Sequence, residues 1–330
     1  MKLLILGGTG FVGRAFTEAA IANGHEITLF NRGHQNPDLF SAHEQIFGDR
    51  GVDLSALSNR TWDAVFDSSG YLPRVVKMSA ERLKDSVHNY LFISTISVYE
   101  NFSVPNQDEN SALKPIINQA TEEVTGETYG PFKVACEDEV VSAFGNRSTI
   151  VRPGLVVGPH DTTDRFTYWP LRMHEGGDVL VPDVKEQPCQ FIDARDLGEW
   201  CLKLIEESVT GIFNAVGPPV PYRLEDVLTA CAIGTYSNLI WASPEFLNAH
   251  DVQPWRDLPF VLGFDRSGYG MTQMNVSKAV AAGLRFRPLA ETVQDTLQWS
   301  LSLPSDRTWK VGLPRAKEAE VIREWKRLHI

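Results

Sequence analysis

Residues 3–13 read Leu-Leu-Ile-Leu-Gly-Gly-Thr-Gly-Phe-Val-Gly, an apolar run that passes directly into a glycine-rich loop. The run has the composition of a buried strand, and a helical pattern follows the loop. Gly7 can make the tight turn, Gly10 lets a phosphate approach the backbone, and Gly13 lets the helix pack closely on the strand. N–H groups at a helix start favour an anion. The segment predicts a pyrophosphate-binding loop made of Gly7, Gly8, Thr9, Gly10, Phe11, Val12 and Gly13, with an ordinary strand-to-helix turn as the alternative.

Short apolar runs alternate with stretches of helical pattern through the first half of the chain. This alternation predicts βαβ units around a parallel sheet. The expected strands are Lys2–Leu6, Glu26–Phe30, Ala64–Asp67, Tyr90–Ser94 and Ser148–Val151. The expected helices are about Val12–Asn23, Pro73–Ser86 and Pro131–Phe144. We therefore predict an α/β fold, a Rossmann-type doubly wound parallel sheet with a smaller C-terminal α/β substrate domain.

The pattern loosens after Val151 into segments that carry proline and glycine, which suits a substrate-binding region. A strand and helix pattern returns at Gln190–Glu207 and Ile212–Val216, so the chain is expected to re-enter the main sheet. We assign residues 1–155, with 190–216 returning, to the cofactor domain. Residues 156–189 and 217–330 form the substrate-binding part, in which the tail 314–330 suits a surface helix docked by one face.

The composition is that of an ordinary globular protein, with 43% hydrophobic and 22% charged residues among 330. The formal charge of -11 repels polyanions, so a nucleic-acid partner is disfavoured. The glycines at 7 and 8 interrupt the opening apolar run, and no later stretch approaches 18 apolar residues. We therefore expect a cytoplasmic protein with no membrane partner.

The four cysteines show neither metal-knuckle spacing nor the density of a disulfide scaffold; they are Cys136, Cys189, Cys201 and Cys231. The eight histidines show no i,i+4 pair typical of metal ligands. We therefore expect reduced structural thiols and no metal site.

The second expected strand ends in Asn31-Arg32-Gly33, where an NAD-selective site would usually place an acidic residue for the ribose 2′-hydroxyl. Arg32 can instead pair with a 2′-phosphate, which favours NADP(H) over NAD(H); a solvated loop arginine is the alternative. The remaining expected cofactor residues are Asn31, Asp49 and Arg50 toward the adenosine, and Ser68, Ser69 and Gly70 beside the ribose and pyrophosphate.

Tyr129 and Lys133 are four residues apart, which places them on one face of a helix. A free phenol has a pKa of about 10, and a nearby cation lowers the pKa toward the range where a base can act. Thr95 follows an expected strand at the edge where doubly wound folds bind ligands, so its hydroxyl can orient the reacting oxygen. We predict Tyr129 as acid–base, Lys133 as the cation that lowers its pKa, and Thr95 as helper; a surface Tyr–Lys pair is the alternative.

The glycine loop, the 94–99 segment Ser-Thr-Ile-Ser-Val-Tyr and the 129–133 segment, in this order, resemble the short-chain dehydrogenase/reductase superfamily in its extended epimerase/dehydratase-like branch. Segments 152–159 and 190–197 match later landmarks, so the resemblance covers about residues 1–215. It implies a nicotinamide cofactor, whose ribose Lys133 would hold, and it allows a homodimer. It also implies that the nicotinamide passes Pro153, Gly154 and Leu155.

Three departures bear on the reaction. The doubled Gly7-Gly8 is similar to an atypical subgroup whose labels include reductase, sugar dehydratase and RNA-binding protein. Cys189 stands where sugar-nucleotide epimerases often carry an arginine, and Ile96 and Ser97 stand where dehydratases carry acidic residues. The asparagine of many family proton relays has no counterpart in residues 71–83, so proton exchange would run through water.

We therefore predict an NAD(P)-dependent oxidoreductase that transfers hydride at a carbonyl or secondary alcohol of a small or sugar-like substrate. A sugar or nucleotide-sugar epimerase is the first alternative, and a catalytically silent cofactor-sensing or RNA-binding protein is the second. The expected contacts to this small-molecule substrate are Tyr99, His160, Arg165 and Tyr168. For the 160–172 cluster, a solvated lid with aromatic packing is equally compatible.

Overall fold

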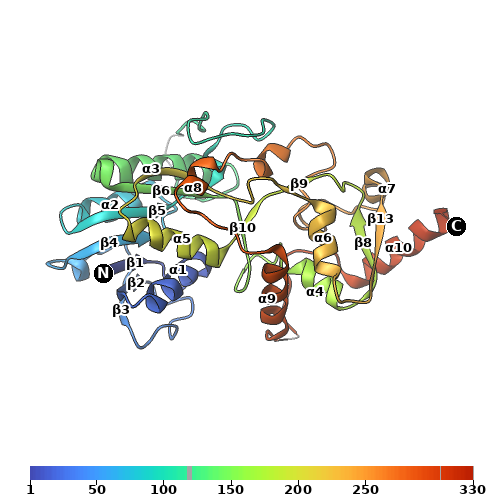
Figure 1. The fold of residues 1–330 in the computed structure, drawn as a ribbon, viewed down its shortest axis with the longest axis horizontal. Coiled ribbons are helices and arrows are strands. Elements are labelled where there is room, and N and C mark those ends of the chain that lie inside the picture. The colour runs from blue at the N-terminus through green and yellow to red at the C-terminus, as the bar shows by residue number, and fades with distance from the viewer. Residues whose placement is uncertain (117–120, 305, 330) are drawn as a thin grey trace.

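A seven-stranded parallel sheet organises the first two thirds of the chain in the computed structural model, which describes residues 1–116, 121–304 and 306–329 (Figure 1). Its strands, in chain order, are β1 (Lys2–Leu6), β2 (Glu26–Asn31), β3 (Glu44–Phe47), β4 (Trp62–Asp67), β5 (Val87–Ile93), β6 (Ser148–Pro153) and β11 (Gly211–Ala215). Their spatial order is β11-β6-β5-β4-β1-β2-β3, and every neighbouring pair is parallel. The order reverses beside β1, which is where doubly wound sheets bind ligands.

Helices cover both faces of this sheet, so its central strands are apolar on both sides (Figure 1). Leu3 and Ile5 of β1 pack toward one face with α1 (Phe11–Ala22) and α5 (Ala194–Glu206). Leu4 and Leu6 pack toward the other face with α2 (Pro73–Leu83) and α3 (Tyr129–Phe144). The two faces together make the core that fixes the strand ends and the loops that follow them.

The structure confirms the predicted Rossmann-type parallel sheet with a smaller C-terminal α/β region. β1 has the predicted bounds, and α1, α2 and α3 lie within three residues of theirs. β3 was not among the expected strands. β3 is a short edge strand that is only partly buried. Its sequence therefore has no continuous apolar run from which a strand could be predicted.

Among its described residues, the C-terminal part has three two-stranded sheets, which pair β8 (Gly177–Pro182) with β13 (Ser237–Ala242), β7 (Leu155–Val157) with β10 (Phe191–Asp193), and β9 (Pro188–Cys189) with β12 (Tyr222–Arg223). Its helices are α4 (Tyr168–His174), α6 (Leu224–Ala232), α7 (Pro244–Ala249), α8 (Ser277–Ala281), α9 (Leu289–Leu301) and α10 (Arg315–His329). Except for α8, they gather with β8 and β13 at the end of the molecule away from the N-terminus (Figure 1). One apolar cluster, which includes Trp169, Leu180 and Leu247, forms their core.

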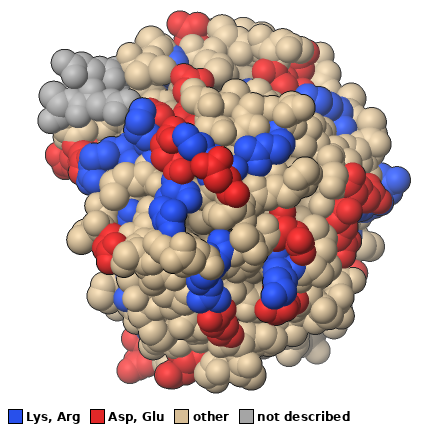
Figure 2. Space-filling view, turned by 90° about the vertical axis from the view of Figure 1, so that its left-hand side faces the viewer, with Lys and Arg blue, Asp and Glu red and all other residues tan. Residues whose placement is uncertain are grey.

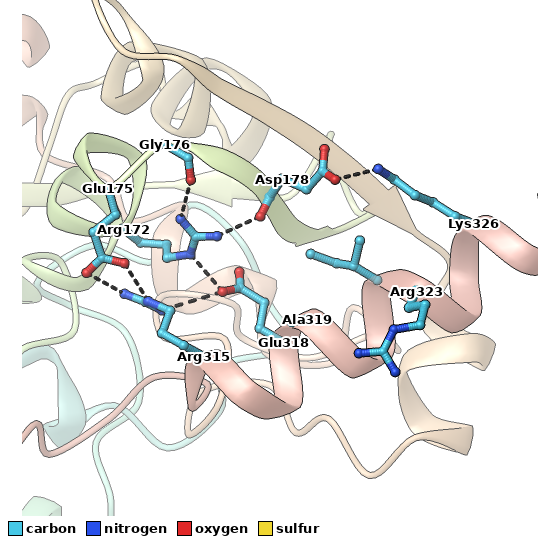
Figure 3. A pocket seen from close by; sticks show the side chains of 10 residues that line it. Arg172, Glu175, Gly176, Asp178, Arg315, Glu318, Ala319, Arg323 and Lys326 are labelled. Carbon is cyan, nitrogen blue, oxygen red and sulfur yellow. Dashed lines mark hydrogen bonds and ion pairs between the residues drawn. The ribbon is translucent and has the colours of Figure 1, made fainter.

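Charged side chains dock α10 on α4 and β8 around a surface hollow of about 530 Å³ (Figure 3). Glu318 is 2% exposed and accepts from Arg172 Nε at 2.7 Å and from the backbone N–H of Leu180 at 3.1 Å. Arg315 pairs with Glu175 at the rim of the hollow. The tail therefore docks by one face, as its pattern predicted, but a buried ion pair holds it in addition to apolar contacts.

Replacing Glu318 by Gln should lower the free energy of unfolding by about 3 kcal/mol, because it leaves the buried Arg172 guanidinium without a counter-charge. Urea denaturation followed by circular dichroism measures the change. Glu320→Gln on the exposed face of α10 is the control and should stay within about 0.5 kcal/mol of wild type. Equal losses in the two variants would contradict the role of the buried pair.

Candidate active site

A cleft of about 870 Å³ lies beyond the carboxyl ends of β1 to β4. Twelve of the predicted cofactor residues line it: Gly7, Thr9, Gly10, Phe11, Val12, Gly13, Asn31, Arg32, Asp49, Arg50, Ser68 and Ser69. The lining also includes residues that the sequence did not single out, among them His34, Val52, Tyr71, Arg74 and Thr162. The cleft therefore brings four strand ends, distant in the sequence, to one elongated site.

The glycine loop has the geometry of an anion cradle. Gly7 has a φ of +88°, a conformation that favours glycine. A Cβ on Gly13 would stand 2.0 Å from the Gly7 carbonyl oxygen, so only glycine allows this close approach of helix and loop. A Cβ on Gly10 would meet nothing closer than 3.6 Å, which leaves open space over the loop. Gly10 begins α1 without a side-chain cap or an acidic residue in the first turn, which suits a bound phosphate.

Gly8 does not line the cleft, unlike the rest of the loop. It is buried, and a Cβ there would stand 2.3 Å from Leu29 Cδ2 of β2. The second glycine of the doubled pair is therefore required by packing against the sheet.

The part of the cleft beside the end of β2 has an unpaired donor and an exposed cation. Asn31 Oδ1 accepts the N–H of Gly33 at 3.0 Å, whereas its buried Nδ2 has no partner within the described residues. Arg32 is exposed at the cleft, and no carboxylate of the described chain lies within 4 Å of its guanidinium. Asp49 is the one acidic residue of the lining. The orphaned amide and the open space at Gly10 fit a dinucleotide laid from Arg32 to the glycine loop.

Arg50 has a structural role in addition to the predicted contact with adenine. Its guanidinium is buried and donates to both carboxylate oxygens of Asp67, at 2.6 and 2.8 Å, and to Ser69 Oγ at 3.1 Å. Tyr90 also donates to Asp67 at 2.7 Å. Burial alone would raise the pKa of Asp67, but Arg50 beside it holds the pKa below its usual value. Arg50 lines the cleft, so its contact with the adenosine stays a prediction, and its guanidinium also braces the floor of the cleft through Asp67.

Tyr129, Lys133 and Thr95 meet where β4 and β5 end. Tyr129 is the first residue of α3, and Lys133 lies one turn later with its side chain buried. The Lys133 ammonium donates to the carbonyls of Gly70, at 2.8 Å, and Ile93, at 2.6 Å. Thr95 Oγ accepts the N–H of Ser97 at 3.1 Å, which leaves its own O–H free to donate. The structure thus places a phenol, a cation and a hydroxyl at one edge of the sheet.

The predicted lowering of the phenol pKa by Lys133 is wrong for this structure. Burial first, and then the neighbouring Tyr71, raise the pKa of Tyr129 to about 12, although the nearby Thr95 hydroxyl lowers it. The Lys133 ammonium faces two backbone carbonyls instead of the phenol, and burial lowers its own pKa to about 8. The physical reason is that desolvation of the phenol outweighs a cation directed elsewhere.

A buried polar network lies behind Thr95 and includes Tyr99. Arg152 donates to both oxygens of Glu137, at 3.0 and 2.6 Å, and Ser94 Oγ also donates to Glu137. Tyr99 is fully buried, donates to Asn214 at 2.6 Å and accepts from Arg152 at 3.1 Å. The predicted substrate contact of Tyr99 is therefore corrected, because its hydroxyl is saturated inside the core.

The other predicted substrate residues lie outside the cleft lining. Tyr168 is 4% exposed within the C-terminal core, so its expected substrate contact is also corrected. His160 Nδ1 lies 3.3 Å from an Arg14 nitrogen, and its ring packs edge-on against Trp299 at 5.4 Å. The Arg165 guanidinium stacks over Trp255 at 4.9 Å. These contacts match the aromatic-packing alternative of the sequence analysis.

The residues expected near the nicotinamide also stand beyond this lining. Pro153 ends β6, and a Cβ on the following Gly154 would come within 3.2 Å of Val216 and Ile96. Leu155 packs at the border of the C-terminal core. Gly70 is buried against Phe92 and Val76, and it reaches the site through the carbonyl that accepts from Lys133.

Two further features concern the helices and the potential metal ligands of the described ranges. None of these helices has the combination of length and apolar character needed to cross a bilayer. Within the same ranges, no group of three or more His, Cys, Asp or Glu side chains is arranged to hold a metal ion.

Comparison with known proteins identifies the type of chain. Residues 3–216 match the model of the NAD dependent epimerase/dehydratase family. The chloroplast stem-loop binding protein of 41 kDa b from Arabidopsis thaliana is 26% identical over 249 residues, which cover 70% of this chain but only 62% of that protein. The 2-alkyl-3-oxoalkanoate reductase of Stenotrophomonas maltophilia is 28% identical over 179 residues, 49% of this chain and 52% of the reductase. The epimerase family protein SDR39U1 of Bos taurus is 25% identical over 237 residues, 66% and 75% of the two chains.

Solved epimerase structures share the fold. A UDP-N-acetylglucosamine 4-epimerase from Bacillus cereus superimposes with a TM-score of 0.67 at 16% identity, over 94% of this chain and 99% of the other. A putative epimerase from Burkholderia cenocepacia gives 0.68 at 20% identity, over 90% and 97%. At such identities the likeness concerns the architecture alone.

Substitutions at Gly10 and Gly13 should separate ligand binding from folding. Gly10→Ala should leave thermal stability nearly unchanged but weaken binding of a nicotinamide dinucleotide about tenfold, about 1.4 kcal/mol, because the methyl group enters the open space. Gly13→Ala should lower both, since its Cβ would overlap the Gly7 carbonyl. Fluorescence titration with NADPH and thermal unfolding measure the two effects. Wild-type affinity in Gly10→Ala would contradict the assigned cradle.

Proposed function

The chain belongs to the NAD-dependent epimerase/dehydratase family, and from this premise we propose that it is an NADP-preferring oxidoreductase. It would reduce a carbonyl, or oxidise the corresponding secondary alcohol, on a small or sugar-like substrate. When bound, the cofactor supplies or accepts the hydride at its nicotinamide ring. The chain's own residues hold the dinucleotide, orient the reacting oxygen and carry the proton.

The cleft supports the choice of cofactor. The glycine loop and the N-terminus of α1 would hold the pyrophosphate through backbone N–H groups. Asn31 Nδ2 would contact the adenosine ribose, which gives that buried donor a partner. Arg32 would bind the 2′-phosphate, because its exposed guanidinium has the fork geometry that recognises phosphate.

The meeting of the Tyr129 phenol, the Thr95 hydroxyl and the Lys133 ammonium at one edge of the sheet is the observation that carries the proposed reaction. With a pKa of about 12, the phenol keeps its proton across neutral pH, which is the form that carbonyl reduction needs. Thr95 would donate its O–H to the substrate oxygen while Tyr129 delivers the proton to it. Oxidation of an alcohol needs the phenolate instead. At pH values below the pKa, the phenolate fraction is small and increases about tenfold for each unit by which the pH is raised. The site is thus suited to the reductive direction.

Neighbouring side chains argue against elimination as the reaction. Ile96 and Ser97 follow Thr95 in the 3-10 turn Ile96–Val98, so no carboxylate stands beside the helper hydroxyl there. Dehydration needs a base to remove a proton from carbon, which neither residue supplies.

The surface charge gives little support to a polyanion-binding function. Figure 2 shows Lys and Arg interspersed with Asp and Glu on the face it presents. In the Rossmann part, Arg74 pairs with Glu122 and Lys77 with Glu139. Such pairs neutralise cations that would otherwise contact phosphates.

One experiment separates the functional classes. The cofactor carried by the purified protein is identified after denaturation, and NADPH consumption is followed with a panel of small ketones, aldehydes and keto-sugars. A reductase exchanges cofactor and consumes NADPH. A tightly held NAD(H) without net consumption would point to an epimerase, and salt-sensitive binding of a stem-loop RNA without turnover would point to a non-enzyme; either result would overturn the proposal.

Arg32→Ala should weaken NADPH binding roughly 10- to 100-fold while leaving NADH binding nearly unchanged, because only the 2′-phosphate loses a charge-assisted contact. Isothermal titration of both cofactors measures the ratio. Arg323→Ala, which removes the same charge from exposed α10, is the matched control. An unchanged cofactor preference in Arg32→Ala would refute the assignment.

Tyr129→Phe should reduce turnover at least 100-fold while cofactor affinity stays within about threefold, because it removes the proton donor but keeps the ring. The measurement is the rate of NADPH oxidation with the best carbonyl of the panel. Tyr236→Phe serves as control because Tyr236 is 97% exposed and remote from the cleft lining. Retained turnover in Tyr129→Phe would show that another group carries the proton.

A further inference from the structure

Tyr71 is a second phenol beside the acid–base pair. It follows Gly70 directly after β4, and it lines the dinucleotide cleft with about half of its surface exposed. A Cβ on Gly70 would stand 2.5 Å from Phe92 and 2.7 Å from Val76, so the chain is held tightly immediately before Tyr71. The backbone that carries Tyr71 is therefore held by the core behind it.

The Tyr71 ring contacts both members of the acid–base pair. Its centroid lies 6.3 Å from that of Tyr129, at a tilt of 36°. The Lys133 ammonium lies 5.7 Å from the Tyr71 centroid and 4.1 Å from that of the buried Phe92. Lys133 also donates to the carbonyl of Gly70, directly before Tyr71. The ammonium therefore has an aromatic ring from the cleft wall and another from the core within cation–π distance.

We propose that Tyr71 is a positioning residue of the active site, whose ring shields Tyr129 and Lys133 from the solvent of the cleft and keeps the ammonium on the carbonyls of Gly70 and Ile93. This inference rests on the proposed function, since it assigns Tyr71 to the same acid–base machinery. Within residues 71–83, Tyr71 is the side chain whose ring lies within aromatic and cation–π distance of both Tyr129 and Lys133.

The shielding has a measurable electrostatic effect. Burial raises the pKa of Tyr129, and Tyr71 is the next cause in size. The other titratable or charged groups around the pair come from several elements: Asp67 at the end of β4, Arg50 after β3, and Cys136 and Glu137 on α3. Removing the Tyr71 ring would admit water to the phenol and remove Tyr71 itself, and both changes lower the pKa of Tyr129.

The test is a titration of the protein alone. With ¹³C-labelled tyrosine, the Cζ resonance reports phenol ionisation up to about pH 11, and Tyr129→Phe identifies the signal. Wild-type Tyr129 should stay protonated throughout. In Tyr71→Ala its midpoint should fall by about one pH unit, a tenfold larger phenolate fraction at a given pH. Tyr71→Phe should lie between the two, because it keeps the shielding ring but removes the Tyr71 phenol, whose charge also raises the pKa of Tyr129.

Tyr236→Ala is the matched control and should leave the Tyr129 signal unchanged. If Tyr71→Ala lowers the thermal midpoint, Tyr71→Leu replaces it, because leucine keeps apolar bulk but covers less of the Tyr129 phenol than the ring and has no hydroxyl, so the pKa of Tyr129 should still fall, by less than in Tyr71→Ala. A Tyr129 midpoint in Tyr71→Ala or Tyr71→Leu equal to that of wild type would overturn the proposal. No substrate or cofactor enters the titration, so its failure is distinct from failure of the reductase assay.

Discussion

The buried ammonium of Lys133 ties helix α3 to the ends of two strands. It donates to the carbonyls of Gly70, after β4, and Ile93, at the end of β5. A charge inside a protein is costly unless it is hydrogen-bonded, so these carbonyls fix where the side chain can lie. Tyr129 lies one turn earlier on the same helix and shares that constraint. The position of the phenol at the sheet edge is thus a consequence of how one lysine is solvated by backbone.

Two buried ion pairs support the same edge from below. Arg50 and Asp67 hold Ser69 beneath the cleft, and Arg152 and Glu137 form a network that includes Ser94, next to Thr95. Each pair joins segments that are distant in the sequence, and each would leave an uncompensated charge if one partner were lost. Rigidity of the loops therefore comes from buried charges that are paired within the protein.

Periodicity and glycine spacing were enough to predict the sheet and the cleft. β1 is a continuous apolar run, and Gly7, Gly10 and Gly13 each satisfy a local steric need. The roles of these residues can therefore be predicted from their immediate neighbours in the sequence. Tyr99 and Arg50 could not be placed in this way, because their partners Asn214 and Asp67 come from other elements. The pKa of Tyr129 could not be predicted from the sequence either. The i,i+4 spacing places Lys133 on the same helix face, but it does not show that the ammonium is directed at two backbone carbonyls.

The strand order also has a consequence for how the protein is made. β11 pairs only with β6 at the end of the sheet, and residues 154–210 separate the two strands along the chain. While a ribosome is still synthesising that stretch, the emerging β6 lacks its outer neighbour and presents unsatisfied backbone groups. Such an open, apolar border is a place where nascent chains associate wrongly. During translation, correct folding of the domain therefore depends on how soon Gly211–Ala215 is synthesised and pairs with β6.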